Sequence, residues 1–254
     1  MKKIKKYLNY AIYSITHRSS KKERPYIFIL SHKRGRTTLL SHILASHSKI
    51  CGYRELHCSY DKGINLTKSK VALYEDPKSF EQADFLHDKL LHNELLVDES
   101  LFSKLPKYIF VLREPQATML SMLKRHLDVS DPKTLHIQAD YYITRLKQLQ
   151  NLWKTVKGPK LFVDSDEMVA NTSNSLAGIS KFIELEQPLS EEYQTFKHTG
   201  TAGMGDMSGS ISQGKIIPQK KQLLDADFEL LSKVDMKVIK DVYLETKNVF
   251  LANA

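Results

Sequence analysis

At 254 residues the chain can bury one good hydrophobic core, and a single α/β domain of this length is ordinary. The net charge of +9 lies almost entirely in residues 1–24, which hold eight Lys or Arg and one Glu, whereas the rest of the chain holds 30 basic and 28 acidic side chains. A nearly neutral body excludes a nucleic-acid-binding protein. The two cysteines, Cys51 and Cys58, indicate neither a zinc site nor a disulfide framework, so we expect a reducing, cytoplasmic setting.

Residues 1–24 form a basic segment whose apolar positions follow a helical repeat. Four lysines stand at its start, and the apolar stripe consists of Ile4, Leu8, Ala11, Ile12 and Ile15. Two interpretations are open: a helix that lies on an anionic membrane, or a helix docked on its own domain with a solvated lysine end. Asn9 interrupts the apolar stretch and no small-residue cleavage site follows, so the segment is not a signal peptide.

The next element is a short apolar run, residues 26–30, followed by a cationic loop. The run is typical of a buried strand, and the Thr-Thr-Leu-Leu of residues 37–40 is typical of the start of a helix. Between them stand a glycine and three cations. A strand, a cationic loop and a helix N-terminus in that order form an anion site, because backbone N–H groups and the positive end of the helix dipole point at the ligand.

Strands and helices alternate along the rest of the chain. We expect strands at residues 83–88, 107–112 and 160–163, and helices at residues 37–47, 115–127, 135–156, 176–183 and 228–251. The glycine-rich residues 198–214 have no apolar periodicity and are predicted to form a loop. The alternation predicts an α/β fold with one domain over residues 25–254, in which a central, mainly parallel sheet is flanked by helices on both faces.

The loop fails the common triphosphatase motif G-x-x-x-x-G-K-[ST], because it has no Gly-Lys-Thr/Ser and its Arg34 precedes the glycine. It resembles the 5′-phosphosulfate loop of the sulfotransferases that use 3′-phosphoadenosine 5′-phosphosulfate (PAPS), which have a P-loop-NTPase-like fold. The resemblance implies that six consecutive residues bind the donor: Lys33, Arg34, Gly35, Arg36, Thr37 and Thr38. Where the family usually has Ser-Gly this chain has Gly35-Arg36, so either Arg36 takes the positive φ of that glycine with strain or the loop shifts by one residue.

A second segment resembles the 3′-phosphate motif of the same family. The strand at residues 107–112 is followed by Arg113 and Pro115, and Ser121 lies eight residues after the arginine. An arginine can grip a phosphate through two N–H groups, and a hydroxyl two turns into the helix can reach the same oxygens. The resemblance implies that Arg113 and Ser121 bind the 3′-phosphate of PAPS. Residues 203–216 are similar to the late glycine-rich loop that closes over the nucleotide in many members of the family.

Sulfuryl transfer needs a base that removes the proton of the acceptor hydroxyl, and the scheme requires no metal. By resemblance to the carbohydrate-type branch of the family, Glu55 is the candidate base and His57 the second choice. The same resemblance places Arg34 on the bridging and 5′-phosphate oxygens of the donor. An ion pair of Glu55 with Arg54, or with another loop cation, is the structural alternative.

The segment around Lys89 resembles one that lines the acceptor pocket in bacterial relatives. Lys89 is expected either to stabilise the leaving group or hold the acceptor, or to be a solvated lysine beside Asp88.

The resemblance as a whole implies a PAPS-dependent sulfotransferase that transfers a sulfuryl group by in-line displacement and releases PAP. The expected acceptor is a hydroxyl of a small molecule, a glycan or a glycolipid. Peripheral contact with the inner face of a membrane through residues 1–24 is an expected further interaction. Two alternatives are open: an atypical nucleotide-dependent phosphotransferase, and a catalytically impaired PAP-binding module.

Overall fold

A sheet of five parallel strands forms the centre of the molecule. The computed structural model describes residues 2–17, 22–124, 132–200, 209–217 and 223–252. The strands are β1 (Tyr26–Ser31), β2 (Ile50–Cys51), β3 (Phe85–Leu90), β4 (Lys107–Leu112) and β5 (Lys160–Asp164), in the order β2-β3-β1-β4-β5. Every pairing between neighbours is parallel, which confirms the predicted α/β sheet.

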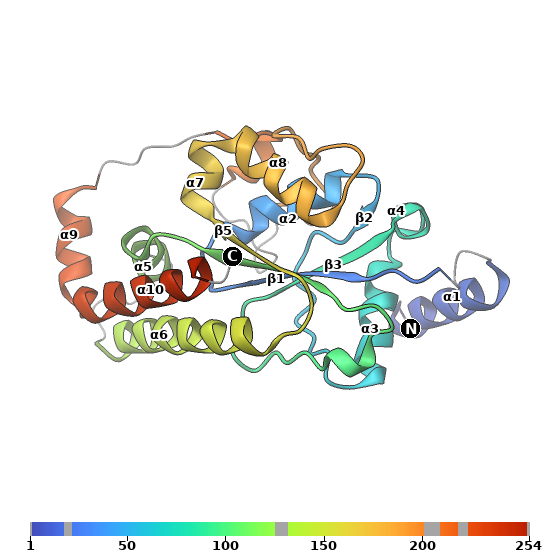
Figure 1. Cartoon of the computed structure of the whole chain (residues 1–254), viewed down its shortest axis with the longest axis horizontal. Coiled ribbons are helices and arrows are strands. Elements are labelled where there is room, and N and C mark those ends of the chain that lie inside the picture. The colour runs from blue at the N-terminus through green and yellow to red at the C-terminus, as the bar shows by residue number, and fades with distance from the viewer. Residues whose placement is uncertain (1, 18–21, 125–131, 201–208, 218–222, 253–254) are drawn as a thin grey trace.

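Helices cover both faces of this sheet (Figure 1). They are α1 (Lys2–Thr16), α2 (Thr37–Ser46), α3 (Gly63–Leu73), α4 (Pro77–Gln82), α5 (Pro115–Leu123), α6 (Pro132–Thr155), α7 (Ser165–Ala170), α8 (Thr172–Ile183), α9 (Asp225–Ser232) and α10 (Met236–Leu251). Helices α2, α7 and α8 lie on one face, and α6 and α10 lie on the other. The helices that the sequence did not predict are the short ones, α4 and α7, together with α3.

Successive residues of β1 point into two different cores. Tyr26, Phe28 and Leu30 belong to the cluster that contains the buried side chains of α6 and α10. Ile27 and Ile29 belong to the cluster that contains those of α2 and α8. Residues 26–30 of the strand are therefore all apolar, because both of its faces are buried under helices.

The order of the strands fixes where a ligand can approach. After β1 the chain continues to β2 on one side of the sheet, whereas after the neighbouring β4 it continues to β5 on the other side. The connections that follow β1 and β4 therefore diverge and leave a crevice at the carboxyl ends of these two strands. Both predicted phosphate segments begin at this edge.

Several predicted boundaries differ from the structure, and α6 and α8 begin three and four residues earlier than expected. The strand expected at residues 83–88 lies two residues later, as β3. The single helix expected at residues 228–251 is two helices, because the side chain of Asp235 accepts hydrogen bonds from the N–H groups of Lys237 and Val238 and starts a new helix there. The helix expected at residues 115–127 is described as far as Leu123, and residues 125–131 lie outside the described part.

The glycine-rich loop is described only at its two ends. Residues 198–200 and 209–214 contain no helix beyond one 3₁₀ turn, Ile211–Gln213, which agrees with the predicted loop. Residues 201–208, which carry part of the predicted nucleotide-closing segment, lie outside the described residues.

The N-terminal segment forms the predicted helix, α1. It docks on its own domain through Tyr10 and Tyr13, whose rings contact Tyr74 and Phe80. The predicted apolar stripe is exposed along its whole length, so the contact with the domain is aromatic and not aliphatic.

Across the helices described, none combines the length and the apolar composition that crossing a membrane requires.

Candidate active site

The anion loop joins β1 to α2 and contains two arginines in the left-handed conformation. Arg34 has φ 64° and Arg36 has φ 59°. Of the two alternatives that the departure from Ser-Gly left open, Arg36 thus takes the strained conformation. Gly35 has a different reason to be glycine: a Cβ there would lie 2.5 Å from the Oγ of Ser31 and 3.1 Å from the carbonyl oxygen of His32. The loop can pass this closely over the end of β1 only without a side chain.

Helix α2 begins directly after the loop and presents its first N–H groups to the crevice. Its N-cap residue, Arg36, provides no side-chain cap. The first N–H groups of a helix have no partner within it, so those of Thr37 and Thr38 remain available to an anion. The strand, the cationic loop and the helix follow one another as the sequence predicted.

His32 ties the loop to the end of β4. Its Nδ1–H donates to the carbonyl oxygen of Lys33 at 2.8 Å, and its Nε2 accepts from the backbone N–H of Arg113 at 3.2 Å. Burial lowers the pKa of His32 to about 4, and the charges of Arg113 and Arg145 act in the same direction. The ring is therefore neutral near pH 7 and acts as a strut between the two predicted phosphate segments.

The structure brings the two predicted phosphate segments into direct contact. The Nε–H of Arg34 donates to the Oγ of Ser121 at 2.8 Å, and an Nη1–H of Arg113 donates to the carbonyl oxygen of Arg34 at 3.1 Å. The Nε of Arg113 is buried and has no hydrogen-bond partner among the described residues. Burial, reinforced by the charge of Arg36, lowers the pKa of Arg113 to about 10, which leaves the side chain a cation near pH 7.

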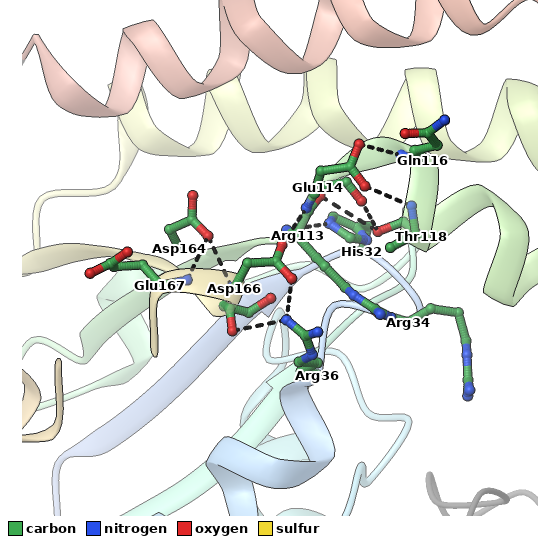
Figure 2. A network of polar contacts seen from close by, with 12 residues as sticks. His32, Arg34, Arg36, Arg113, Glu114, Gln116, Thr118, Asp164, Asp166 and Glu167 are labelled. Atoms are coloured by element: carbon green, nitrogen blue, oxygen red, sulfur yellow. Dashed lines mark hydrogen bonds and ion pairs between the residues drawn. The ribbon is translucent and has the colours of Figure 1, made fainter. Parts of the chain in front are cut away.

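Arg36 is turned away from this cluster and toward Asp166 (Figure 2). Its Nη1 donates to Asp166 and, at 3.1 Å, to the carbonyl oxygen of Ser165. The other carboxylate oxygen of Asp166 accepts from the N–H of Glu114 at 2.8 Å. Asp166 therefore pins both the anion loop and the corner after β4, and it neutralises one of the three loop cations.

Lys33 and Thr38 are also engaged by side chains of the fold. The Nζ of Lys33 lies 4.4 Å from the centre of the Tyr141 ring, and its backbone N–H donates to the Tyr141 hydroxyl at 2.9 Å. The Oγ1 of Thr38 accepts a hydrogen bond of 3.1 Å from the Nζ of Lys89. Lys89 thus reaches the predicted donor loop from the end of β3.

Lys89 is 1% exposed, so the expectation of a solvated lysine is wrong. Burial lowers its pKa to about 8, although the charges of Glu55 and Asp88 oppose the shift. Asp88 points to the other side of β3, where its carboxylate accepts from the Tyr60 hydroxyl at 2.7 Å and from two backbone N–H groups. Burial raises the pKa of Asp88 to about 7.

Glu55 lies between two histidines at the same edge of the sheet. Its Oε1 is 3.5 Å from the Nδ1 of His57 and 3.5 Å from the Nε2 of His92. This oxygen is buried and has no hydrogen-bond partner among the described residues. Arg54 pairs with Glu75 instead, at 3.1 Å, so the predicted alternative of an Arg54–Glu55 ion pair is wrong.

The fold of the chain matches the folds of known proteins. The structure is similar to the sulfotransferase domain of the Synechococcus PCC 7002 olefin synthase, with a TM-score of 0.57 at 19% identity over 88% of this chain and 96% of that one. The chain has the sulfotransferase fold. The sulfotransferase domain from the curacin biosynthetic pathway is similar too, with a TM-score of 0.52 at 17% identity over 84% and 98% of the two chains. No family model and no curated protein matches the sequence.

The fold places all ten predicted site residues around one edge of the sheet, together with residues that the sequence analysis did not name. Asp166 is the second residue after β5, in the first turn of α7, a position comparable with that of Arg113 after β4. Arg145 lies on the apolar stripe of α6 and is fully buried. Its Nε donates to the carbonyl oxygen of Ser31 at 2.9 Å and its Nη2 to that of Leu90, so it ties the ends of β1 and β3 together.

His92 belongs to the segment whose resemblance implied an acceptor pocket, although it was not named as a site residue, and it bears on the prediction that the site holds no metal. The ligand atoms of Glu55, His57 and His92 all lie within 4.8 Å of one another, so the three side chains have the spacing to hold a metal ion. Sulfuryl transfer does not require one, and the same carboxylate between two imidazoles suits a base.

Proposed function

We propose that this protein is a sulfotransferase that moves a sulfuryl group from PAPS to a hydroxyl by in-line displacement. The observation that carries the proposal is the cluster of Arg34, Ser121 and Arg113 at the carboxyl ends of β1 and β4. Two half-buried guanidinium groups, those of Arg34 and Arg113, meet there beside the Ser121 hydroxyl. A site of this kind favours a ligand with more than one anionic group.

The residues present fit both ends of such a donor. The open N–H groups at the start of α2 suit the 5′-phosphosulfate, with Arg34 beside them. The buried Nε of Arg113 and the hydroxyl of Ser121 suit the 3′-phosphate, because the Nε–H then gains the hydrogen bond that it lacks. The guanidinium of Arg36 is already engaged by Asp166, so in this proposal Arg36 holds the loop in place and does not bind the donor.

Glu55 is the base in this proposal, and the two imidazoles beside it orient the carboxylate. The acceptor hydroxyl gives its proton to Glu55 as its oxygen attacks the sulfur, and negative charge develops on the departing phosphate. Lys89 supports the Thr38 hydroxyl on the side of the leaving group, which places a buried cation behind the developing charge.

We propose a hydroxyl of a carbohydrate or a glycolipid as the acceptor. The two similar solved domains come from an olefin synthase and from the curacin biosynthetic pathway, so hydroxyl substrates of those pathways are the competing class. A panel that contains both classes, with radiolabelled PAPS as the donor, distinguishes them by which acceptor becomes labelled.

Binding of PAP tests the donor site without knowledge of the acceptor. A ligand that binds only the folded state raises the melting temperature. PAP should therefore raise the melting temperature at micromolar to millimolar concentration without magnesium, and ATP with magnesium should raise it less. No shift at millimolar PAP contradicts the proposal, a shift specific to ATP with magnesium favours a phosphotransferase, and PAP binding without transfer to any acceptor favours an impaired binding module.

A further inference from the structure

Helix α1 exposes an aliphatic stripe that consists of Ile4, Leu8, Ile12 and Ile15. Their side chains are 73%, 57%, 50% and 86% exposed. Four large aliphatic residues on one face of a 15-residue helix form a continuous apolar strip rather than scattered single exposures. A strip of this kind marks a surface that binds something.

The helix cannot bury this stripe by rolling onto its own domain. The opposite side is already docked: Tyr13 is 2% exposed, and its ring lies 4.6 Å from that of Tyr74 and 5.8 Å from that of Phe80. Arg24 fixes the same region by donating to the Tyr13 hydroxyl and to the carbonyl oxygen of Ala83. Turning the stripe inward would remove these aromatic contacts, so the fold presents the stripe outward.

Positive charge accompanies the stripe. Residues 1–24 hold eight cations and one acid. On the helix itself Lys5 is exposed, and Lys6 keeps a side chain that is 48% exposed while it pairs with Glu75. An aliphatic strip with cations around it matches an anionic bilayer, whose acyl chains take the apolar side chains and whose headgroups take the charges.

We propose that α1 is a docking surface for an anionic phospholipid membrane, on which the helix lies in the interface with its aliphatic stripe inserted. The basic charge favours this occupant over a second copy of the chain, because two copies that meet through α1 would bring their like charges together. The expected contact is peripheral and depends on both apolar insertion and charge.

This surface lies at the opposite end of the sheet from the anion loop. Helix α1 packs beside α3 and α4, at the amino ends of the strands, whereas the loop follows the carboxyl end of β1 (Figure 1). Six residues of β1 separate the two, a length of about 20 Å. Membrane binding and donor binding are therefore separable by substitution.

Vesicle sedimentation of the full-length protein tests the proposal. Vesicles with about 30 mol% phosphatidylglycerol should bind at least about 10-fold tighter than pure phosphatidylcholine, and about 0.5 M salt should weaken the binding. The variant Leu8→Asp/Ile12→Asp should lose about 10-fold or more in affinity. The matched control is Val238→Asp/Leu244→Asp, because these side chains of α10 are 43% and 54% exposed, and it should bind like the wild type.

Two further variants keep the test independent of whether α1 folds. Lys5→Glu keeps a good helix former and should weaken binding to anionic vesicles alone. Leu8→Trp adds an exposed reporter to a chain whose single tryptophan, Trp153, is buried, and its emission should shift to the blue on anionic vesicles. PAP should raise the melting temperature of every variant as it does that of the wild type.

Three results overturn the proposal. One is equal vesicle binding by the stripe variant and its matched control. Another is an unchanged emission of Leu8→Trp on anionic vesicles. The third is a concentration-dependent dimer without vesicle binding that Leu8→Asp/Ile12→Asp abolishes, since a second copy then covers the stripe. A failure of PAP to shift any melting temperature bears on the proposed function and leaves the membrane result standing.

Discussion

The Nε–H of Arg34 donates to the Oγ of Ser121 at 2.8 Å and so joins the two segments that were assigned to two different phosphates. Arg113 completes the contact through the carbonyl oxygen of Arg34. In the proposed donor site the two phosphate-binding segments therefore share side chains, and a change in one should alter the affinity of the other.

Coupling between Arg34 and Ser121 is the first prediction. Arg34→Ala and Ser121→Ala should each weaken PAP binding by about 10-fold, because each removes one hydrogen bond to an anion. The double variant should lose less than the product of the two, with a coupling of about 1 kcal/mol, since residues in one network are not additive. Titration of PAP by calorimetry measures the cycle. Arg24→Ala and Ser121→Ala are the control pair: the two residues lie far apart, so their fold-losses in PAP affinity should multiply in the double variant. If the fold-losses of Arg34→Ala and Ser121→Ala also multiply, the two residues do not share a site.

The second prediction concerns the selectivity of Arg113. Arg113→Ala should weaken PAP by about 10- to 100-fold, because it removes a charge-assisted hydrogen bond to the 3′-phosphate. The affinity of the variant for adenosine 5′-phosphosulfate, which lacks that phosphate, should fall by less than about 3-fold. Competition binding with both nucleotides on one protein preparation gives the comparison. Equal losses of affinity for the two nucleotides would mean that Arg113 does not contact the 3′-phosphate.

Much of this site was accessible from the sequence because its residues follow strands directly. Arg34 and Arg113 come within a few residues of the ends of β1 and β4, and carboxyl ends of parallel strands meet at one edge whatever the details of the helices. The apolar runs that define those strands are buried on both faces and are therefore unambiguous.

What the sequence did not predict depends on contacts between distant segments. His92 meets Glu55 across 37 positions, and Arg145 meets Ser31 across 114, so no local pattern indicates either contact. The departure at Arg36 was visible, but its partner Asp166 lies 130 positions away. Two local signs were available: a charged residue on an apolar stripe, as Arg145 is on α6, and the position of Asp166 just after β5.

The third prediction separates backbone strain from side-chain contact at Arg36. Arg36→Ala keeps the positive φ and loses the contacts with Asp166 and Ser165, whereas Arg36→Gly loses the same contacts and removes the strain. The free energy of unfolding of Arg36→Gly should therefore exceed that of Arg36→Ala by about 1 kcal/mol. Denaturant unfolding of the two variants measures it. Equal stabilities would mean that φ 59° carries no penalty here.

The fourth prediction tests Glu55 as the base. Glu55→Gln keeps the shape of the side chain and should lower kcat by about 10²- to 10⁴-fold with unchanged PAP affinity. His92→Ala should lower kcat less, since it positions the carboxylate and does not accept the proton. Glu94→Gln is the matched control, because this exposed carboxylate faces His92 at 3.7 Å without contacting Glu55. A Glu55→Gln enzyme of normal kcat would leave His57 as the candidate.

The last prediction follows from the buried Asp88. Its pKa is raised from 3.8 to about 7 by burial, so the folded state holds the proton more tightly than the unfolded state. The contribution of this carboxyl to stability is therefore largest below about pH 4 and is lost as the pH rises to about 7.

His32 and His87, whose pKa values burial lowers to about 4, change stability in the opposite direction over a similar window. The difference in unfolding free energy between wild type and Asp88→Asn isolates the carboxyl, since asparagine can keep the contacts with Tyr60 and the backbone. The stability of the variant relative to wild type should rise by about 3 kcal/mol between pH 4 and pH 7. A difference that does not change with pH would mean that Asp88 ionises with its ordinary pKa despite its burial.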